Sequence, residues 1–239
     1  MKQPAKGILY LIPVTLGNND DMERVIPAYN HKILHDLRFF IVENVRSARR
    51  FIRKTGHPSS IEAMRFFELN KHTRMEDAAS FLQPLEKGEN MGLLSDAGTP
   101  AVADPGAVVV NLAHRKNIRV VPLSGPNSII LALMSSGFNG QQFCFHGYLP
   151  IDAPARAKKI RELEQEAWKK NTSQIFIETP YRNNKMLESL LRACKPQTLL
   201  CVACNLTLPD ESVETRSIAA WKKETADFNK KPAVFILYK

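Results

Sequence analysis

The sequence predicts an α/β protein made of two domains, and three observations carry this prediction. Short apolar runs alternate with segments of helical periodicity through the first half, as repeated strand and helix units require. One of these runs ends at an acidic residue and gives way to a turn-rich loop, which is typical of the ligand-binding edge of a parallel sheet. All 11 glycines fall between Gly7 and Gly147, so the composition changes along the chain.

The first half contains four candidate strands, at Ile8–Val14, Leu37–Val42, Met91–Ser95 and Ile118–Leu123. A strongly basic helix is expected directly after the second of them. Its basic residues are Arg46, Arg49, Arg50, Arg53 and Lys54, and its apolar face carries Val45, Ala48 and Ile52. Such a stripe can track phosphates, although a solvated helix face is the somewhat more common explanation when the helix is taken alone.

The loop after the third strand holds turn-forming and acidic residues, namely Asp96, Gly98, Pro100, Asp104, Pro105 and Gly106. Its two glycines permit positive φ angles or a close approach of the backbone to a ligand. Asp104 is expected to cap the helix that follows, with Pro105 in its first turn. A tight connection without a ligand remains an alternative. The motifs G-x-G-x-x-G and G-x-x-x-x-G-K-[ST] are absent, which argues against a nucleotide-dependent oxidoreductase.

The second half contains further strand candidates, at Phe143–Leu149, Gln174–Thr179, Thr198–Asn205, Val213–Ile218 and Ala233–Tyr238. Between them lie two apolar helical stripes, one with Ile160, Leu163 and Ala167, the other with Met186, Leu187, Leu190, Leu191 and Cys194. We place the joint near Leu123 to Pro126, which gives domains 1–123 and 124–239.

The net charge of +9 suggests a polyanionic partner without proving one. The spacing of Cys201 and Cys204 inside an apolar run favours buried small hydrophobes over a redox pair or a zinc site. No ligand set for a metal is visible, and we expect none. The short apolar run near the start fits neither an export signal nor a membrane span, so we expect a cytoplasmic protein without a membrane partner.

Five segments give the chain a family resemblance. They are Gly7-Ile-Leu-Tyr-Leu-Ile-Pro-Val-Thr-Leu-Gly-Asn18, Glu43-Asn-Val-Arg46, Leu94-Ser-Asp-Ala-Gly-Thr-Pro-Ala-Val-Ala-Asp-Pro-Gly106, Val121-Pro-Leu-Ser-Gly-Pro-Asn-Ser128 and Phe176-Ile-Glu-Thr-Pro-Tyr-Arg182. In this order they resemble the tetrapyrrole methylase superfamily, and within it the branch that methylates ribosomal small-subunit RNA.

The resemblance implies two α/β domains with S-adenosylmethionine in the cleft between them, and a homodimer. From the first domain, Ser95, Asp96, Gly98, Thr99 and Val102 would line the cofactor, with Asn127 and Ser128 near its methionine end. From the second domain, the family pattern implies Ile177, Glu178, Ala203, Cys204, Pro232 and Ala233 around the adenosine.

The implied reaction is methylation of a ribose 2′-hydroxyl of small-subunit ribosomal RNA. A hydroxyl needs a base within hydrogen-bond reach, and Glu43 is the first candidate, with Asp96 and Asp104 behind it. Arg46 would bind a phosphate of the RNA beside this base. Alternatively, Glu43 and Arg46 simply pair with each other at a turn.

Departures from the family motifs concern the acceptor more than the cofactor. Glu43-Asn-Val-Arg46 stands where glutamate-aspartate-threonine-arginine is usual, Ala203-Cys-Asn-Leu-Thr207 where alanine-arginine-glutamate-leucine-threonine is usual, and Tyr181 takes the place of a histidine. Two other functions therefore stay open. One is methylation of a porphyrin-like ring, and the other is a non-catalytic RNA-binding or assembly factor on the same fold.

Overall fold

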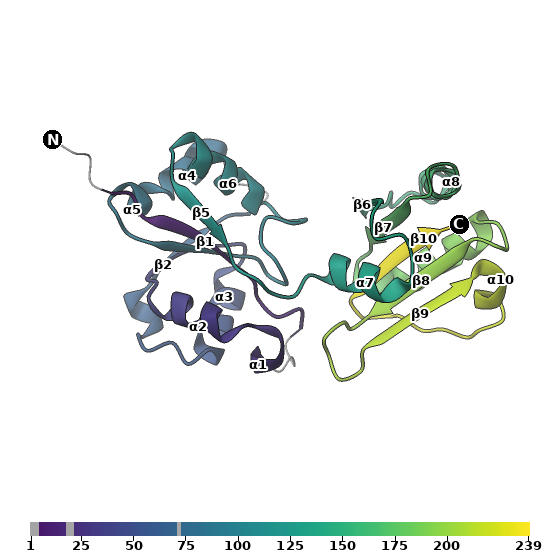
Figure 1. Cartoon of the computed structure of the whole chain (residues 1–239), viewed down its shortest axis with the longest axis horizontal. Helices are drawn as coiled ribbons and strands as arrows, with labels where there is room; N and C mark the ends of the chain where they lie inside the picture. The colour runs from purple at the N-terminus through teal and green to yellow at the C-terminus, as the bar shows by residue number, and fades with distance from the viewer. Residues whose placement is uncertain (1–4, 18–21, 71–72) are drawn as a thin grey trace. The chain divides into compact units, whose positions relative to one another are not determined.

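The computed structural model describes residues 5–17, 22–70 and 73–239. The chain forms two compact units, Met1–Asn127 and Ser128–Lys239 (Figure 1). Unit 2 thus begins a few residues after the joint expected from the sequence. That these units are the family's two domains stays our prediction.

Unit 1 contains a parallel sheet with strand order β3-β2-β4-β1-β5. Its strands are β1 (Ile8–Ile12), β2 (Phe39–Val42), β3 (Arg65–Glu68), β4 (Met91–Leu94) and β5 (Arg119–Pro122). Its helices are α1 (Met22–Val25), α2 (Ala28–His35), α3 (Val45–Lys54), η1 (Ile61–Ala63), α4 (Met75–Ser80), α5 (Gln83–Glu86) and α6 (Gly106–Arg115). The parallel α/β architecture expected for this half is confirmed.

Successive strand residues point to opposite faces of the first sheet, and helices cover the apolar side chains on both faces. Phe40 and Val42 pack with Ile52 of α3 in one apolar cluster, whereas Ile41 packs with Val109 of α6 in another. Figure 1 shows α2 and α3 on one side of this sheet and α4 and α6 on the other. Strands buried on both faces are what a parallel sheet needs.

Unit 2 contains a mixed sheet with strand order β6-β7-β10-β8-β9, in which only β6 and β7 are parallel. Its strands are β6 (Phe143–Tyr148), β7 (Ser173–Ile177), β8 (Leu199–Cys204), β9 (Ser212–Ser217) and β10 (Ala233–Tyr238). Its helices are α7 (Ser128–Ser136), α8 (Ala153–Lys170), η2 (Pro180–Arg182), α9 (Asn183–Ala193) and α10 (Ile218–Trp221).

The two predicted apolar stripes of unit 2 form its core. Ile160 and Leu163 of α8 and Leu190 of α9 pack in one cluster with Phe176 and Phe235 of the sheet. The prediction that Cys201 and Cys204 are buried small hydrophobes is confirmed; Cys194 is buried as well, whereas Cys144 is exposed.

Three details differ from the sequence prediction. Most strands are one or two residues shorter than their apolar runs, and β3 was not predicted. Asp104 is not the N-cap of α6, because Pro105 occupies that position with a helical φ of −71°. Asn18, the last residue of the first family segment, lies outside the described residues. In the parts of the chain that the structure describes, no helix is long and apolar enough to cross a bilayer.

Candidate active site at the carboxyl edge of the first sheet

The strand order of unit 1 creates a point where neighbouring loops diverge. From β1 the chain crosses β4 to reach β2, and from β4 it crosses β1 to reach β5. The loops after the adjacent strands β1 and β4 therefore leave toward opposite faces, which is where open α/β sheets bind ligands. Val14 and Gly98 tie these loops together, since the Val14 backbone N–H donates to the Gly98 carbonyl at 2.9 Å.

The loop after β4 has an unusual backbone. Gly98, Ala101 and Ala103 all have positive φ angles, of 73°, 65° and 62°. For an alanine this left-handed conformation costs about 1–2 kcal/mol, so the surroundings must hold it in place. Val102 lies between the two strained alanines and is 45% exposed, which leaves its side chain available to a ligand.

Asp104 holds this strained loop in place. Its carboxylate accepts hydrogen bonds from the backbone N–H of Ala101 at 2.9 Å and of Gly106 at 2.6 Å. Burial raises the pKa of Asp104, and these two hydrogen bonds oppose the rise. Asp104 therefore positions the loop, which leaves it less suited to be the base that the sequence allowed.

Glu43, Asp96 and Asp104 form a group of interacting carboxyls. Burial, then the charges of Asp104 and Asp96, raise the pKa of Glu43 to about 7, although its carboxylate accepts a hydrogen bond from the Asp96 backbone N–H. Burial also raises the pKa of Asp96, against a hydrogen bond from the Ser47 hydroxyl. A carboxyl with a pKa near 7 is matched to accepting a proton at neutral pH.

Helix α3 follows Glu43 directly and presents its basic residues on two faces. Asn44 caps it by accepting from the Ser47 N–H at 3.0 Å. One basic face includes Arg49, whose guanidinium lies 5.2 Å from the centre of the Phe66 ring of β3. The other includes Arg50, which lines a pocket. The predicted basic helix is thus confirmed, but only part of it faces the carboxyl edge.

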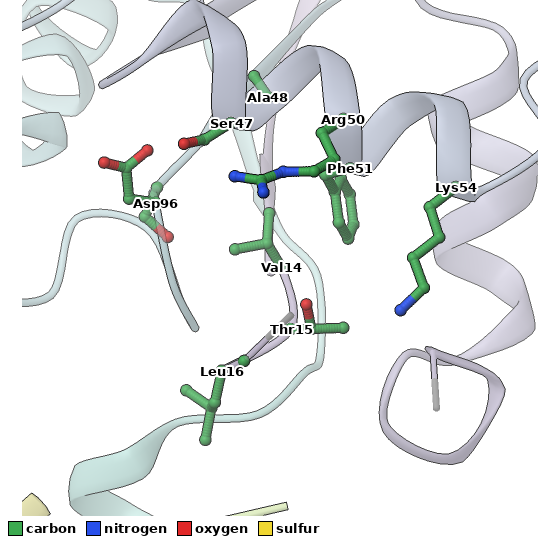
Figure 2. A pocket seen from close by; sticks show the side chains of 11 residues that line it. Val14, Thr15, Leu16, Ser47, Ala48, Arg50, Phe51, Lys54 and Asp96 are labelled. Carbon is green, nitrogen blue, oxygen red and sulfur yellow. The ribbon is translucent and has the colours of Figure 1, made fainter. Parts of the chain in front are cut away.

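The pocket has a volume of about 300 Å³, and we call it the α3 pocket. Its lining comes from the loop after β1, from α3 and from the end of β4: Val14, Thr15, Leu16, Gly17, Ser47, Ala48, Arg50, Phe51, Lys54, Ser95 and Asp96. Figure 2 shows Arg50 reaching along the pocket toward the side where Ser47 and Asp96 lie. The pocket therefore has a cationic and an acidic part.

Arg46, the predicted phosphate contact, is exposed and does not line this pocket. Among the ion pairs of the described residues, none joins it to Glu43. The alternative in which these two residues merely pair is therefore wrong.

Arg50, Lys54 and Ser47 were not singled out as site residues from the sequence. Their spacing carried a signal, because positions 47, 50, 51 and 54 recur at the interval of one helical face. That face flanks the buried stripe of Ala48 and Ile52.

Small polar groups meet beside the β4 loop. The Ser95 hydroxyl donates to the Gly98 carbonyl at 3.1 Å, and the Asn127 side-chain amide donates to the Thr99 hydroxyl. Gly98 is needed here, because a Cβ would lie 3.0 Å from the Leu16 side chain in addition to its positive φ. The structure thus brings the predicted cofactor residues of unit 1 together, and Ser128 follows as the first residue of α7.

The predicted cofactor residues of unit 2 also meet at one edge of their sheet. Ile177 and Glu178 stand at the end of β7, Ala203 and Cys204 at the end of β8, and Pro232 and Ala233 at the start of β10. The pairing registers Val234 with Ile177 and Ala233 with Cys204 bring these ends side by side. The three pairs of residues lie far apart in the sequence, and strand pairing in the folded sheet brings them together.

Some of these side chains already have structural roles. Glu178 is buried and accepts from the Arg182 Nε at 3.0 Å and from the Thr179 backbone N–H at 2.6 Å. The side chains of Cys204 and Ala233 lie in the apolar core, and burial raises the pKa of the Cys204 thiol to about 12. For Cys204 and Ala233, therefore, only the backbone is available to a ligand at this edge of the sheet.

No group of three or more His, Cys, Asp or Glu side chains suited to a metal ion occurs in the described part of the chain.

Residues 25–220 match the family described as tetrapyrrole (corrin/porphyrin) methylases. The chain is 30% identical over 237 residues to ribosomal RNA small subunit methyltransferase I of Escherichia coli O157:H7, covering 98% of this chain and 78% of that protein. It is 29% identical to the protein of the same name from Haemophilus influenzae, over 97% of this chain and 78% of the relative.

Solved structures of similar fold are methyltransferases. The methyltransferase CobJ superposes with a TM-score of 0.63 at 14% identity, covering 98% of this chain and 94% of that one. Uroporphyrin-III C-methyl transferase from Thermus thermophilus, complexed with S-adenosyl homocysteine, gives 0.57 at 15% identity, with 98% of both chains covered. The fold is therefore that of two α/β domains of tetrapyrrole methylase type.

Proposed function

Because this chain belongs to the tetrapyrrole (corrin/porphyrin) methylase family, we propose that it methylates a ribose 2′-hydroxyl of small-subunit ribosomal RNA. The chain is an S-adenosylmethionine-dependent methyltransferase. The observation that carries the choice of acceptor is the similarity, over nearly the whole chain, to relatives named as ribosomal RNA methyltransferases. The basic helix beside a carboxyl group of raised pKa supports it.

S-adenosylmethionine supplies an electrophilic methyl group on a sulfonium and leaves as a neutral thioether. The residues of this chain must then orient the acceptor oxygen and remove its proton. We assign proton removal to Glu43, whose pKa of about 7 lets the carboxylate form accept the hydroxyl proton at neutral pH. Arg46 would contact a phosphate of the same RNA, and correct alignment alone can contribute about 7–11 kcal/mol to lowering the barrier.

The residues of unit 1 suit the amino-acid end of the cofactor. Ser95, Thr99 and Asn127 offer hydroxyl and amide groups, and Gly98 has the positive φ that favours glycine and leaves its backbone without a side chain. We propose that Ser95, Asp96, Gly98, Thr99 and Val102 line the cofactor from unit 1, with Asn127 and Ser128 near its methionine end. For the adenosine we propose the sheet edge formed by Ile177, Glu178, Ala203, Cys204, Pro232 and Ala233.

A transfer assay tests the acceptor. Purified protein is incubated with S-adenosylmethionine labelled in its methyl group and with either small-subunit RNA or a uroporphyrin-type ring. We expect label in RNA, at a position that resists alkaline hydrolysis because a 2′-methoxy group cannot attack the adjacent phosphate. Label in the ring alone would favour the porphyrinoid alternative. RNA binding without calorimetric binding of S-adenosylhomocysteine would favour the non-catalytic factor.

We further propose that the protein is cytoplasmic, as the ribosomal RNA acceptor proposed above requires, and that it is a homodimer, which the family resemblance implies. The chain has a mass of 27.0 kDa, so light scattering during gel filtration should give about twice that value. A single-chain mass at the concentration of the activity assay would contradict the dimer.

A further inference from the structure

The α3 pocket is built from a rigid helix. Ala48 and Ile52 are buried against the sheet, which fixes the rotation of α3 about its axis. Arg50 and Lys54, one helical turn apart, are thereby placed along the pocket. Figure 2 shows both side chains extending from α3 on its pocket side.

The cationic part of the pocket suits a phosphate. Within the described residues, no carboxylate lies at ion-pair distance from Arg50. A guanidinium offers a planar fork of donors that matches two phosphate oxygens, and a lysine adds a point charge. An apolar ligand would gain nothing from a guanidinium or an ammonium group.

The acidic part of the pocket suits a sugar hydroxyl. Ser47 donates to the Asp96 carboxylate, and the Asp96 backbone N–H donates to the Glu43 carboxylate. Carboxylates accept hydrogen bonds from hydroxyls and repel phosphates. The pocket therefore favours one orientation of a nucleotide, with its phosphate at Arg50 and its ribose toward Asp96, which lines the pocket and is hydrogen-bonded through its backbone to Glu43.

We propose that the α3 pocket binds one phosphate and the adjoining ribose of the acceptor RNA, with Arg50 holding the phosphate and Lys54 adding positive charge to the same pocket. This proposal rests on the RNA methylation proposed above and adds the residues that position the acceptor. Arg50 is a positioning residue, because it acts on the phosphate rather than on the reacting hydroxyl.

The test compares Arg50→Gln with Arg115→Gln in the full-length protein. Arg115 is exposed in the last turn of α6. Its substitution removes the same charge at the amino ends of the strands, away from the α3 pocket. We expect Arg50→Gln to raise the KM for RNA about tenfold or more, with a smaller change in kcat. The slope of log affinity against log salt should become shallower by about 0.7, as expected for the loss of one phosphate contact to a single strand.

The outcomes separate this proposal from the one on which it rests. If the wild-type protein transfers no methyl group to RNA, the proposed function fails. If the wild-type protein is active but Arg50→Gln and Arg115→Gln raise the KM equally, only the pocket proposal fails. Weaker calorimetric binding of S-adenosylhomocysteine by Arg50→Gln would also overturn it, because the pocket would then hold the cofactor.

Discussion

Glu43 is the residue on which the catalytic proposal depends. Its pKa of about 7 lies well above the ordinary value of 4.5, because the group is partly buried beside two other carboxyls. Only the carboxylate can accept a proton, so the wild-type rate should rise with pH and level off above about 7. Glu43→Gln should lower kcat about 100-fold or more and remove this rise.

Calorimetry with S-adenosylhomocysteine is the control for Glu43→Gln, because the substitution should leave cofactor affinity unchanged. A variant that turns over at the wild-type rate would exclude Glu43 as the base. Asp96 would then be the next residue to substitute.

Asp104 offers a second test of the same electrostatic coupling. Its charge is the second-largest cause of the raised Glu43 pKa, after burial. Asp104→Asn keeps an oxygen that can accept from Ala101 and Gly106 but removes the charge, so the rise in rate should shift to lower pH. An unshifted pH profile in a folded Asp104→Asn protein would show that the two groups are not coupled.

Asp104→Ala separates the loop-holding role from the electrostatic one. It removes the acceptor of two backbone N–H groups next to the strained alanines, which should lower the free energy of unfolding by about 1–3 kcal/mol. Urea unfolding measures this loss, and Asp104→Asn should lose less.

At the scale of elements, the loops after β1 and β5 approach each other closely. A Cβ on Gly125 would lie only 2.3 Å from the Cβ of Pro13, so both loops depend on this glycine. Gly125→Ala should lower the free energy of unfolding by about 1–3 kcal/mol, as for other overpacked sites. Gly140→Ala is the control, since nothing lies within 4 Å of its Cβ position. Equal unfolding free energies for the two variants would contradict the close approach.

The elements that the sequence predicted well are those with long apolar signals. Residues 91–94 are buried throughout β4, and the stripes of α8 and α9 follow helical periodicity over several turns. Strand β3 was missed because Arg65 and Glu68 are exposed at its two ends and only Phe66 and Phe67 lie between them. Pairing with β2 makes it a strand, and such pairing is a tertiary effect that a short segment does not encode locally.

At the scale of the whole molecule, the sequence predicted the kind of candidate site better than the exact residues that line its pocket. The loop after β4 and Glu43 were identified because acidic and turn residues follow apolar runs. Arg46 was named as a phosphate contact because it lies near Glu43 in sequence, and this assignment stays a prediction, whereas Arg50 is the arginine that lines the α3 pocket. The rotation of α3 about its axis decides which arginine reaches the pocket, and that rotation depends on how Ala48 and Ile52 pack against the sheet.

The proposed cofactor residues come from both units, so one ligand should protect segments far apart in sequence. Binding to the native state at about 100 times Kd adds about 2.7 kcal/mol to the stability of whatever it contacts. In hydrogen exchange, S-adenosylhomocysteine should slow amides in 95–102 of unit 1 and in 177–179 and 203–205 of unit 2. Amides in η1 and α10 serve as controls in the same experiment. Protection confined to unit 1 would refute the adenosine assignment and leave the methionine-end residues standing, because the two groups lie in separately folded sheets.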